Sequence, residues 1–176
     1  MTLAQKKILR FLIIGAVAYV LLLLFYELVI RPYTPIDYEI NYNIAQTGQF
    51  LFSIFGVETV IDVESDHVSL MRDAFSRTGV WIGDQCNGFK LFSLFSLLII
   101  LLPGNRKSKY WFIPLGIIII HLVNVFRIMA LLIVFEKYPL SLDFNHKYTF
   151  TILVYAVIFG LWWWWARKYS RNEQRT

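Results

Sequence analysis

The sequence predicts an all-α integral membrane protein with four transmembrane helices. Hydrophobic residues make up 57% of the 176 residues and charged residues only 16%, whereas about a quarter of the residues in soluble domains are charged. The mean hydropathy is +0.55. Four apolar stretches have the roughly 17 to 25 residues that a helix needs to cross a bilayer. They cover residues 8–30, 86–102, 111–135 and 148–166, and we expect a single polytopic membrane domain over residues 1–176.

The first apolar stretch has features of a signal peptide. Three basic residues precede it, Lys6, Lys7 and Arg10, and the triplet of residues 16–18 (Ala-Val-Ala) is similar to a cleavage site. That triplet lies in the middle of the apolar run, whereas a cleavage site follows the apolar region of a signal peptide. We therefore expect a retained helix.

The distribution of charge predicts the orientation of the spans, because cytoplasmic loops carry the excess of Lys and Arg. Basic residues gather before the first span, in residues 103–110 and after the fourth span (Lys6, Lys7 and Arg10; Arg106, Lys107 and Lys109; Arg167, Lys168, Arg171 and Arg175). Segment 31–80 is acidic instead, with seven carboxylates (Asp37, Glu39, Glu58, Asp62, Glu64, Asp66 and Asp73). We expect both termini in the cytoplasm and segment 31–80 outside a bacterial inner (plasma) membrane. The basic residues responsible for the formal net charge of +5 then lie beside lipid headgroups, so this charge does not indicate nucleic-acid binding.

The long extracytoplasmic segment between helices 1 and 2 contains signals of its own. An apolar patch at residues 50–55 is closed by Gly56, which predicts an interfacial helix on the outer leaflet, with a packed loop as the alternative. Residues 57–70 and 80–82 are rich in β-branched side chains and alternate in part, which is typical of short strands. Near the other end of the chain, the run Trp162 to Trp165 fits an aromatic belt at the inner membrane interface.

Few polar side chains lie within or at the ends of the spans: Cys86, Lys90, His121, Asn124, Arg127 and His146. Such residues are expensive in lipid and are therefore functional candidates. Cys86 and His146 open the second and fourth spans at their outer ends. Arg127 lies eight residues before Phe135, hence about 12 Å below the outer end of the third span, and its long side chain can extend outward from there. We expect Cys86, Arg127 and His146 to converge near the outer membrane face.

Cys86 is the only cysteine, so it forms no disulfide within the chain. A helix N-terminus favours a thiolate, and Lys90 one turn later adds positive charge. Gly88 allows a substrate or another backbone to approach closely. These features predict a nucleophile; the alternative is a small side chain that only packs.

His146 has an ordinary pKa near 6.5, which suits a general base or acid, although a helix-capping or solvated histidine is the alternative. Arg127 has no carboxylate in its own span to neutralise it, and a guanidinium is suited to stabilise an oxyanion. Asn124 shares a helix face with Arg127, and we expect it to hold the guanidinium by a hydrogen bond. His121 lies about 21 Å from the outer end and is expected to be a packing residue.

Other chemistries lack their motifs. One cysteine and three scattered histidines do not provide a metal site, so no metal and no cofactor are predicted. The sequence also contains no Gly-rich phosphate loop and no G-x-S-x-G motif.

The motif of residues 86–90 (Cys-Asn-Gly-Phe-Lys), the N-x-x-R motif from Asn124 to Arg127, and the downstream His146 occur in this order. In these elements, over residues of about 44–160, the chain resembles the exosortase/archaeosortase family. Asn87 stands where Ser or Ala is usual and Phe89 where an aliphatic residue is usual, and many members have more spans. The chain resembles the compact exosortase F-type branch.

The resemblance implies a membrane transpeptidase whose nucleophile is Cys86, assisted by Arg127 and His146. Its implied substrates are exported proteins with a C-terminal sorting signal, consisting of a short motif, a transmembrane helix and a basic tail. The implied acceptor is a membrane-bound or lipid-linked amine. The alternative function is a non-enzymatic subunit for assembly or export that binds lipid headgroups or partner helices. A transporter is weaker, because the sequence shows neither paired interrupted helices nor an inverted repeat.

Overall fold

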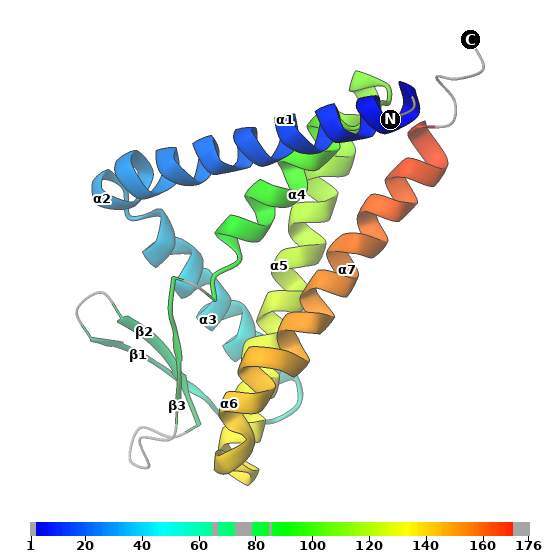
Figure 1. Cartoon of the computed structure of the whole chain (residues 1–176). Helices are drawn as coiled ribbons and strands as arrows, with labels where there is room; N and C mark the ends of the chain where they lie inside the picture. Colours follow the sequence, from blue (N-terminus) through cyan, green and yellow to red (C-terminus); the bar gives the residue numbers. More distant parts are fainter. Residues whose placement is uncertain (1–2, 65–66, 73–78, 85, 171–176) are drawn as a thin grey trace. The chain divides into compact units, whose positions relative to one another are not determined.

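A computed structural model describes residues 3–64, 67–72, 79–84 and 86–170 as mostly helical with one small sheet (Figure 1). The helices are α1 (Leu3–Phe25), α2 (Arg31–Tyr33), α3 (Ile36–Ile54), α4 (Phe89–Leu101), α5 (Arg106–Lys137), α6 (Leu142–Phe144) and α7 (Phe150–Trp165). The strands are β1 (Val60–Glu64), β2 (His67–Met71) and β3 (Gly79–Ile82). One-turn π-helical segments follow α1 and α7 and precede α7, at Tyr26–Ile30, Ala166–Ser170 and Asn145–Thr149.

Within the described residues, three helical segments are long and apolar enough to cross a membrane: Ile8–Tyr33, Arg106–Lys137 and Pro139–Tyr169. They contain the first, third and fourth predicted spans. Many large apolar side chains of α1 are exposed, among them Ile8, Leu12, Val17 and Leu21. Exposed apolar side chains on a long helix are expected where lipid surrounds it. The chain is therefore a membrane protein, as predicted.

The second predicted span, residues 86–102, is not confirmed. Its helix α4 has only 13 residues, about 20 Å at 1.5 Å per residue, which is less than the hydrocarbon thickness. The helix begins three residues late because Gly88 has a φ of 85°, in the left-handed region that helix interiors exclude. It ends before Pro103, which disfavours the helical conformation of the residue preceding it.

The chain divides into two compact units, and α5 and α7 contribute to both. The first unit comprises residues 1–34, 90–118 and 158–176, and the second comprises residues 35–89 and 119–157. A single domain over residues 1–176 stays a prediction.

Aromatic side chains form the interior of the first unit. Trp165 is fully buried, and its ring centroid lies 4.9 Å from that of Phe112 and 4.6 Å from that of Tyr169. The indole N–H of Trp165 donates to the carbonyl of Pro103 at 3.3 Å. On α5, Gly116 faces Phe95 so closely that an added Cβ would lie 2.2 Å from its ring. This unit depends on close apolar packing.

The second unit has a core formed by α3, the sheet and α5. Its fully buried members include Ile44 of α3, Val68 and Leu70 of β2, and Leu132 of α5. The strands are antiparallel in the order β1-β2-β3, with Leu70 opposite Ile61 on one side and Val80 on the other. Val68 and Leu70 alternate with less buried neighbours, so the predicted strands are confirmed with the expected period of two.

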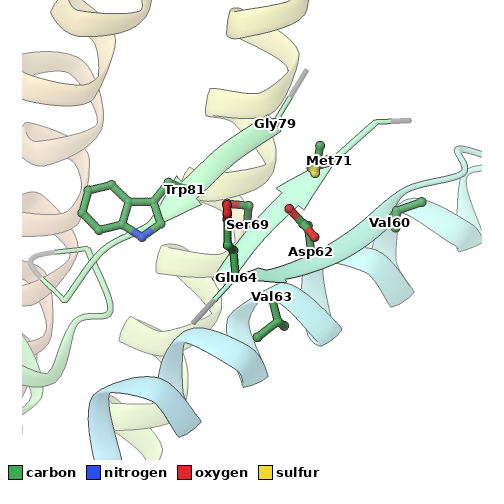
Figure 2. A pocket seen from close by; sticks show the side chains of 8 residues that line it. All are labelled: Val60, Asp62, Val63, Glu64, Ser69, Met71, Gly79 and Trp81. Atoms are coloured by element: carbon green, nitrogen blue, oxygen red, sulfur yellow. The ribbon is translucent and has the colours of Figure 1, made fainter. Parts of the chain in front are cut away.

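The face of the sheet opposite this core is hollowed and more polar. Figure 2 shows the side chains that line the hollow, which include Asp62, Glu64, Ser69 and Trp81. The sheet therefore has one apolar face and one open face, as is common for antiparallel sheets.

Residues 50–54 of the apolar patch are helical and Phe55 caps the helix in a turn, so the packed-loop alternative is wrong. These residues are the last part of the 19-residue helix α3, which is longer than the sequence indicated. Phe52 is 4% exposed and belongs to the core, whereas Phe50, Ile54 and Phe55 are exposed. Contact of these exposed side chains with a membrane surface stays a prediction.

Candidate functional site

Cys86 lies in a turn before α4 that we call the cysteine loop (residues 83, 84 and 86–88). Its backbone N–H donates to the carbonyl of Gly83 at 2.7 Å. The side-chain oxygen of Asn87 accepts the N–H of Phe89 at 2.9 Å. Gly88 supplies the left-handed residue that joins the loop to α4. Cys86 is thus three residues before the helix instead of opening it as predicted.

His146 lies directly against the cysteine. Its Nε2 is 3.1 Å from Sγ of Cys86, although the two residues are 60 positions apart in the chain. The histidine belongs to the π-helical segment Asn145–Thr149, immediately before α7, and is half-buried. Single π-helical turns within helices are frequent at functional sites. At this separation, a proton can pass between the thiol and the imidazole.

Arg127 completes the group from α5. It is only 8% exposed, and its Nη2 donates to the backbone carbonyl of His146 at 3.4 Å. The same carbonyl accepts the hydroxyl of Thr151 at 3.1 Å. The Nε atom of Arg127 is buried without a hydrogen-bond partner among the described residues. A buried, unpaired donor beside a nucleophile is available to an incoming oxygen atom.

Burial raises the pKa of the Cys86 thiol above its ordinary value. The positive charge of Arg127 and a hydrogen bond from the Gly83 backbone lower it, but burial has the larger effect. The expectation that a helix end and Lys90 would favour a thiolate is therefore wrong. A thiol with a raised pKa needs a base in order to react as a nucleophile, and Nε2 of His146 lies 3.1 Å from Sγ.

Lys90 is held within the first unit. Its Nζ lies 2.8 Å from Oε1 of Glu27 and 5.5 Å from the ring centroid of Tyr26. Glu27 also pairs with Arg31 at 3.1 Å. The ammonium group is thus neutralised by a carboxylate of α1's C-terminal extension, and it is not among the groups that set the thiol pKa.

Asn124 contacts the cysteine loop instead of Arg127. Its side-chain N–H₂ donates to the backbone carbonyl of Cys86, and its side-chain oxygen is buried with no hydrogen-bond partner among the described residues. The expected Asn124–Arg127 hydrogen bond is thus replaced by one that anchors the backbone of Cys86. The geometric reason is that the loop packs against α5 at Asn124, one helical turn before Arg127.

Two polar residues of α3 were missed by the sequence reasoning. Asp37 accepts a hydrogen bond from the side chain of Asn87 at 2.6 Å, and Asn41 donates to the side chain of Asp84 at 3.3 Å. Both are buried, on the helix face that also carries Ile44, Ala45 and Phe52. Two polar residues at helical spacing within an apolar face were the signal available in the sequence.

Comparison with known families yields one match. A family model described as transmembrane exosortase matches residues 2–165, which is most of the chain. No curated protein and no solved structure matches the chain. The matched range includes every residue placed at the candidate site.

Proposed function

Because the chain belongs to the transmembrane exosortase family, we propose that it is a membrane-embedded cysteine transpeptidase. In this proposal it cleaves a C-terminal sorting signal from exported proteins and transfers the proteins to an amine acceptor. Cys86 is the nucleophile, His146 moves the protons and Arg127 stabilises the oxyanion. No metal or cofactor takes part.

The observation that carries this proposal is the 3.1 Å contact between Sγ of Cys86 and Nε2 of His146. Residues that serve only to pack a helical bundle have no need to place an imidazole nitrogen on the single thiol of the chain. A nucleophile and a base within hydrogen-bond distance are the arrangement that covalent catalysis requires. The buried Nε of Arg127, which has no hydrogen-bond partner in the described part of the chain, adds a donor for the charge that develops on the substrate oxygen.

In the first half of the reaction, His146 Nε2 takes the thiol proton while Sγ of Cys86 attacks the scissile carbonyl carbon. The carbonyl oxygen becomes an oxyanion, which Arg127 stabilises. When the tetrahedral intermediate collapses, the C–N bond breaks and His146 returns the proton to the leaving amine. The exported protein is then held as a thioester on Cys86, and the released product is the sorting signal's membrane helix with its tail.

In the second half, His146 accepts a proton from the acceptor amine as the amine attacks the thioester carbon. The oxyanion forms again beside Arg127, and the C–S bond breaks to leave a new amide bond. The proton on His146 passes to the departing sulfur, so the neutral thiol is regenerated. Transfer to an amine dominates over hydrolysis as long as water is kept from the thioester.

The proposal includes the location of this chemistry. Four spans with both termini in the cytoplasm of a bacterium place Cys86 and His146 at the extracytoplasmic face of the inner membrane. The short helix α4 then spans the membrane with help from its flanking residues, as apolar helices shorter than the bilayer do. The partners are exported proteins with sorting signals and a membrane-bound or lipid-linked amine.

Co-expression with a tagged candidate substrate from the same genome tests the proposal. The wild type should convert the substrate to a smaller species, and Cys86→Ala should leave it at full size. Cys86→Ser is the matched variant, since it keeps a hydroxyl of similar shape but has a poorer nucleophile, and we expect it to lose conversion too. Equal conversion by the wild type and Cys86→Ala would show that the cysteine is not the nucleophile and would favour a non-enzymatic membrane subunit.

A further inference from the structure

The cysteine loop is held from α3 by two pairs of polar side chains, of which Asp37–Asn87 is buried and Asn41–Asp84 is partly buried. Asp37 and Asn41 lie one helical turn apart on α3 and bond to Asn87 and Asp84 of the loop. Asp37 is 8% exposed and Asn87 is fully buried. Burying a carboxylate is costly unless strong hydrogen bonds compensate, and the Asp37–Asn87 bond of 2.6 Å is short.

Asn87 connects this carboxylate to the start of α4. Its side-chain nitrogen donates to Asp37, and its side-chain oxygen accepts the N–H of Phe89. Asp37 accepts from the amide nitrogen and the backbone N–H of Phe89 donates to the amide oxygen, so the two partners together fix the orientation of the Asn87 amide. On the other side, Asn124 of α5 donates to the carbonyl of Cys86. The residue that follows the nucleophile is therefore anchored by α3, and the nucleophile itself by α5.

We infer that Asp37 is a positioning residue, which holds the cysteine loop so that Sγ of Cys86 meets Nε2 of His146. Asp37 acts through Asn87 and touches neither the thiol nor the imidazole. A reactive pair tolerates little displacement, and shifts of about 1 Å can reduce rates by about 10²-fold. This inference rests on the proposed roles of Cys86 and His146.

The test measures how strongly His146 affects the reactivity of Cys86, in the purified full-length protein without substrate. Iodoacetamide labels the single cysteine at neutral pH, and the ratio of the labelling rates with and without His146→Ala is recorded. Removing His146 should slow labelling, because the thiol loses its base. The same ratio is then measured in the Asp37→Ala background, which completes a double-mutant cycle.

We expect the factor by which His146→Ala slows labelling to be at least about threefold smaller in the Asp37→Ala background. The reason is that the Cys86 thiol no longer lies within hydrogen-bond distance of the His146 imidazole. Asp37→Asn should preserve most of the effect, since an amide oxygen can still accept from Asn87. The matched control is Glu39→Ala, which removes an exposed carboxylate from the same first turn of α3 and should change nothing. The labelling rates are compared only between variants that remain folded, because a general loss of stability would also reduce the effect of His146→Ala.

Asn87→Ala removes the same hydrogen bond by deleting its donor. It should reduce the factor by which His146→Ala slows labelling as much as Asp37→Ala does. The double variant Asp37→Ala/Asn87→Ala removes both partners of the Asp37–Asn87 hydrogen bond, so neither side chain is left without the other, and it serves if either single variant fails to fold. An unchanged His146 effect in the folded variants would overturn the positioning role alone. If His146→Ala has no effect in the otherwise wild-type protein, the Cys86–His146 pair fails as a reactive unit, and both the inference and the proposed function fail with it.

Discussion

The two units of the molecule differ in what they bury. Among the described residues, the buried polar side chains all belong to the second unit: Asp37, Asn41, Thr59, Asn87, Asn124 and Arg127. The buried side chains of the first unit are apolar or aromatic, with Phe95, Phe112 and Trp165 among the largest. The first unit thus depends on apolar packing, whereas the second also buries polar groups that need a specific reason to be buried.

Because polar side chains are buried only in the second unit among the described residues, we expect substitutions in the two units to affect different properties. Apolar packing supports helices in lipid without any directional bond, so substitutions in the first unit should act through volume. Polar groups in the second unit are held by individual hydrogen bonds. Each of these groups has a defined partner or an atom that has no hydrogen-bond partner among the described residues. Variants in the second unit should therefore change chemistry, and variants in the first unit should change stability.

The largest effect is expected from Arg127→Ala. Loss of an oxyanion donor typically lowers turnover by about 10²–10³-fold, so conversion of a co-expressed substrate should fall by that factor. Arg127→Lys retains the charge but not the planar donor geometry, and we expect intermediate conversion. Measuring conversion at matched protein levels checks this, and a fully active Arg127→Ala variant would refute the oxyanion role.

A second effect concerns the pH dependence of thiol labelling. Because burial raises the pKa of Cys86, the labelling rate should rise with pH to a midpoint above that of an exposed cysteine. Arg127→Ala removes a charge that lowers this pKa, so its midpoint should lie higher still. Iodoacetamide labelling over a pH series gives both midpoints. A wild-type midpoint below the ordinary range would contradict the dominance of burial.

In the first unit, Gly116→Ala should reduce stability without changing the chemistry. The new Cβ would meet Phe95 at 2.2 Å, and overpacking of this kind costs about 1–3 kcal/mol. Gly160→Ala on α7 is the matched control, because nothing lies within 4 Å of its Cβ. Thermal unfolding should separate the two variants, while labelling of Cys86 should be unchanged in both.

The smallest effect is expected from Lys90→Met. Since Lys90 pairs with Glu27 and is not among the charges that set the thiol pKa, labelling of Cys86 should change less than about twofold. The double variant Glu27→Gln/Lys90→Met removes both charges and should express at least as well as the single variant, which leaves Glu27 without its lysine partner. A large change in the labelling rate would show that the charge of Lys90 in the first unit affects the thiol of Cys86 in the second, which contradicts the separation of stability from chemistry between the two units.

The sequence was sufficient to predict the membrane character, three of the spans, the strands and the three residues that converge. These follow from composition, periodicity and the cost of polar groups in lipid, which are local properties of the chain. The start of α4 was missed because one left-handed residue, Gly88, outweighs an otherwise helical apolar run. The roles of Asn124 and Asp37 were missed because their partners lie 38 and 50 residues away, and such pairings depend on tertiary structure. The thiol pKa was misjudged for the same reason, since burial is a property of the fold.

The most direct test of the account is capture of the acyl-enzyme. After co-expression with a tagged substrate, the protein is isolated at mildly acidic pH and the mass of the peptide containing Cys86 is measured. If Cys86 is the nucleophile, its peptide should carry a thioester adduct that hydroxylamine releases and that is absent from Cys86→Ala. Conversion of the substrate with no adduct on Cys86 under any trapping condition, and with full activity in Cys86→Ala, would contradict it.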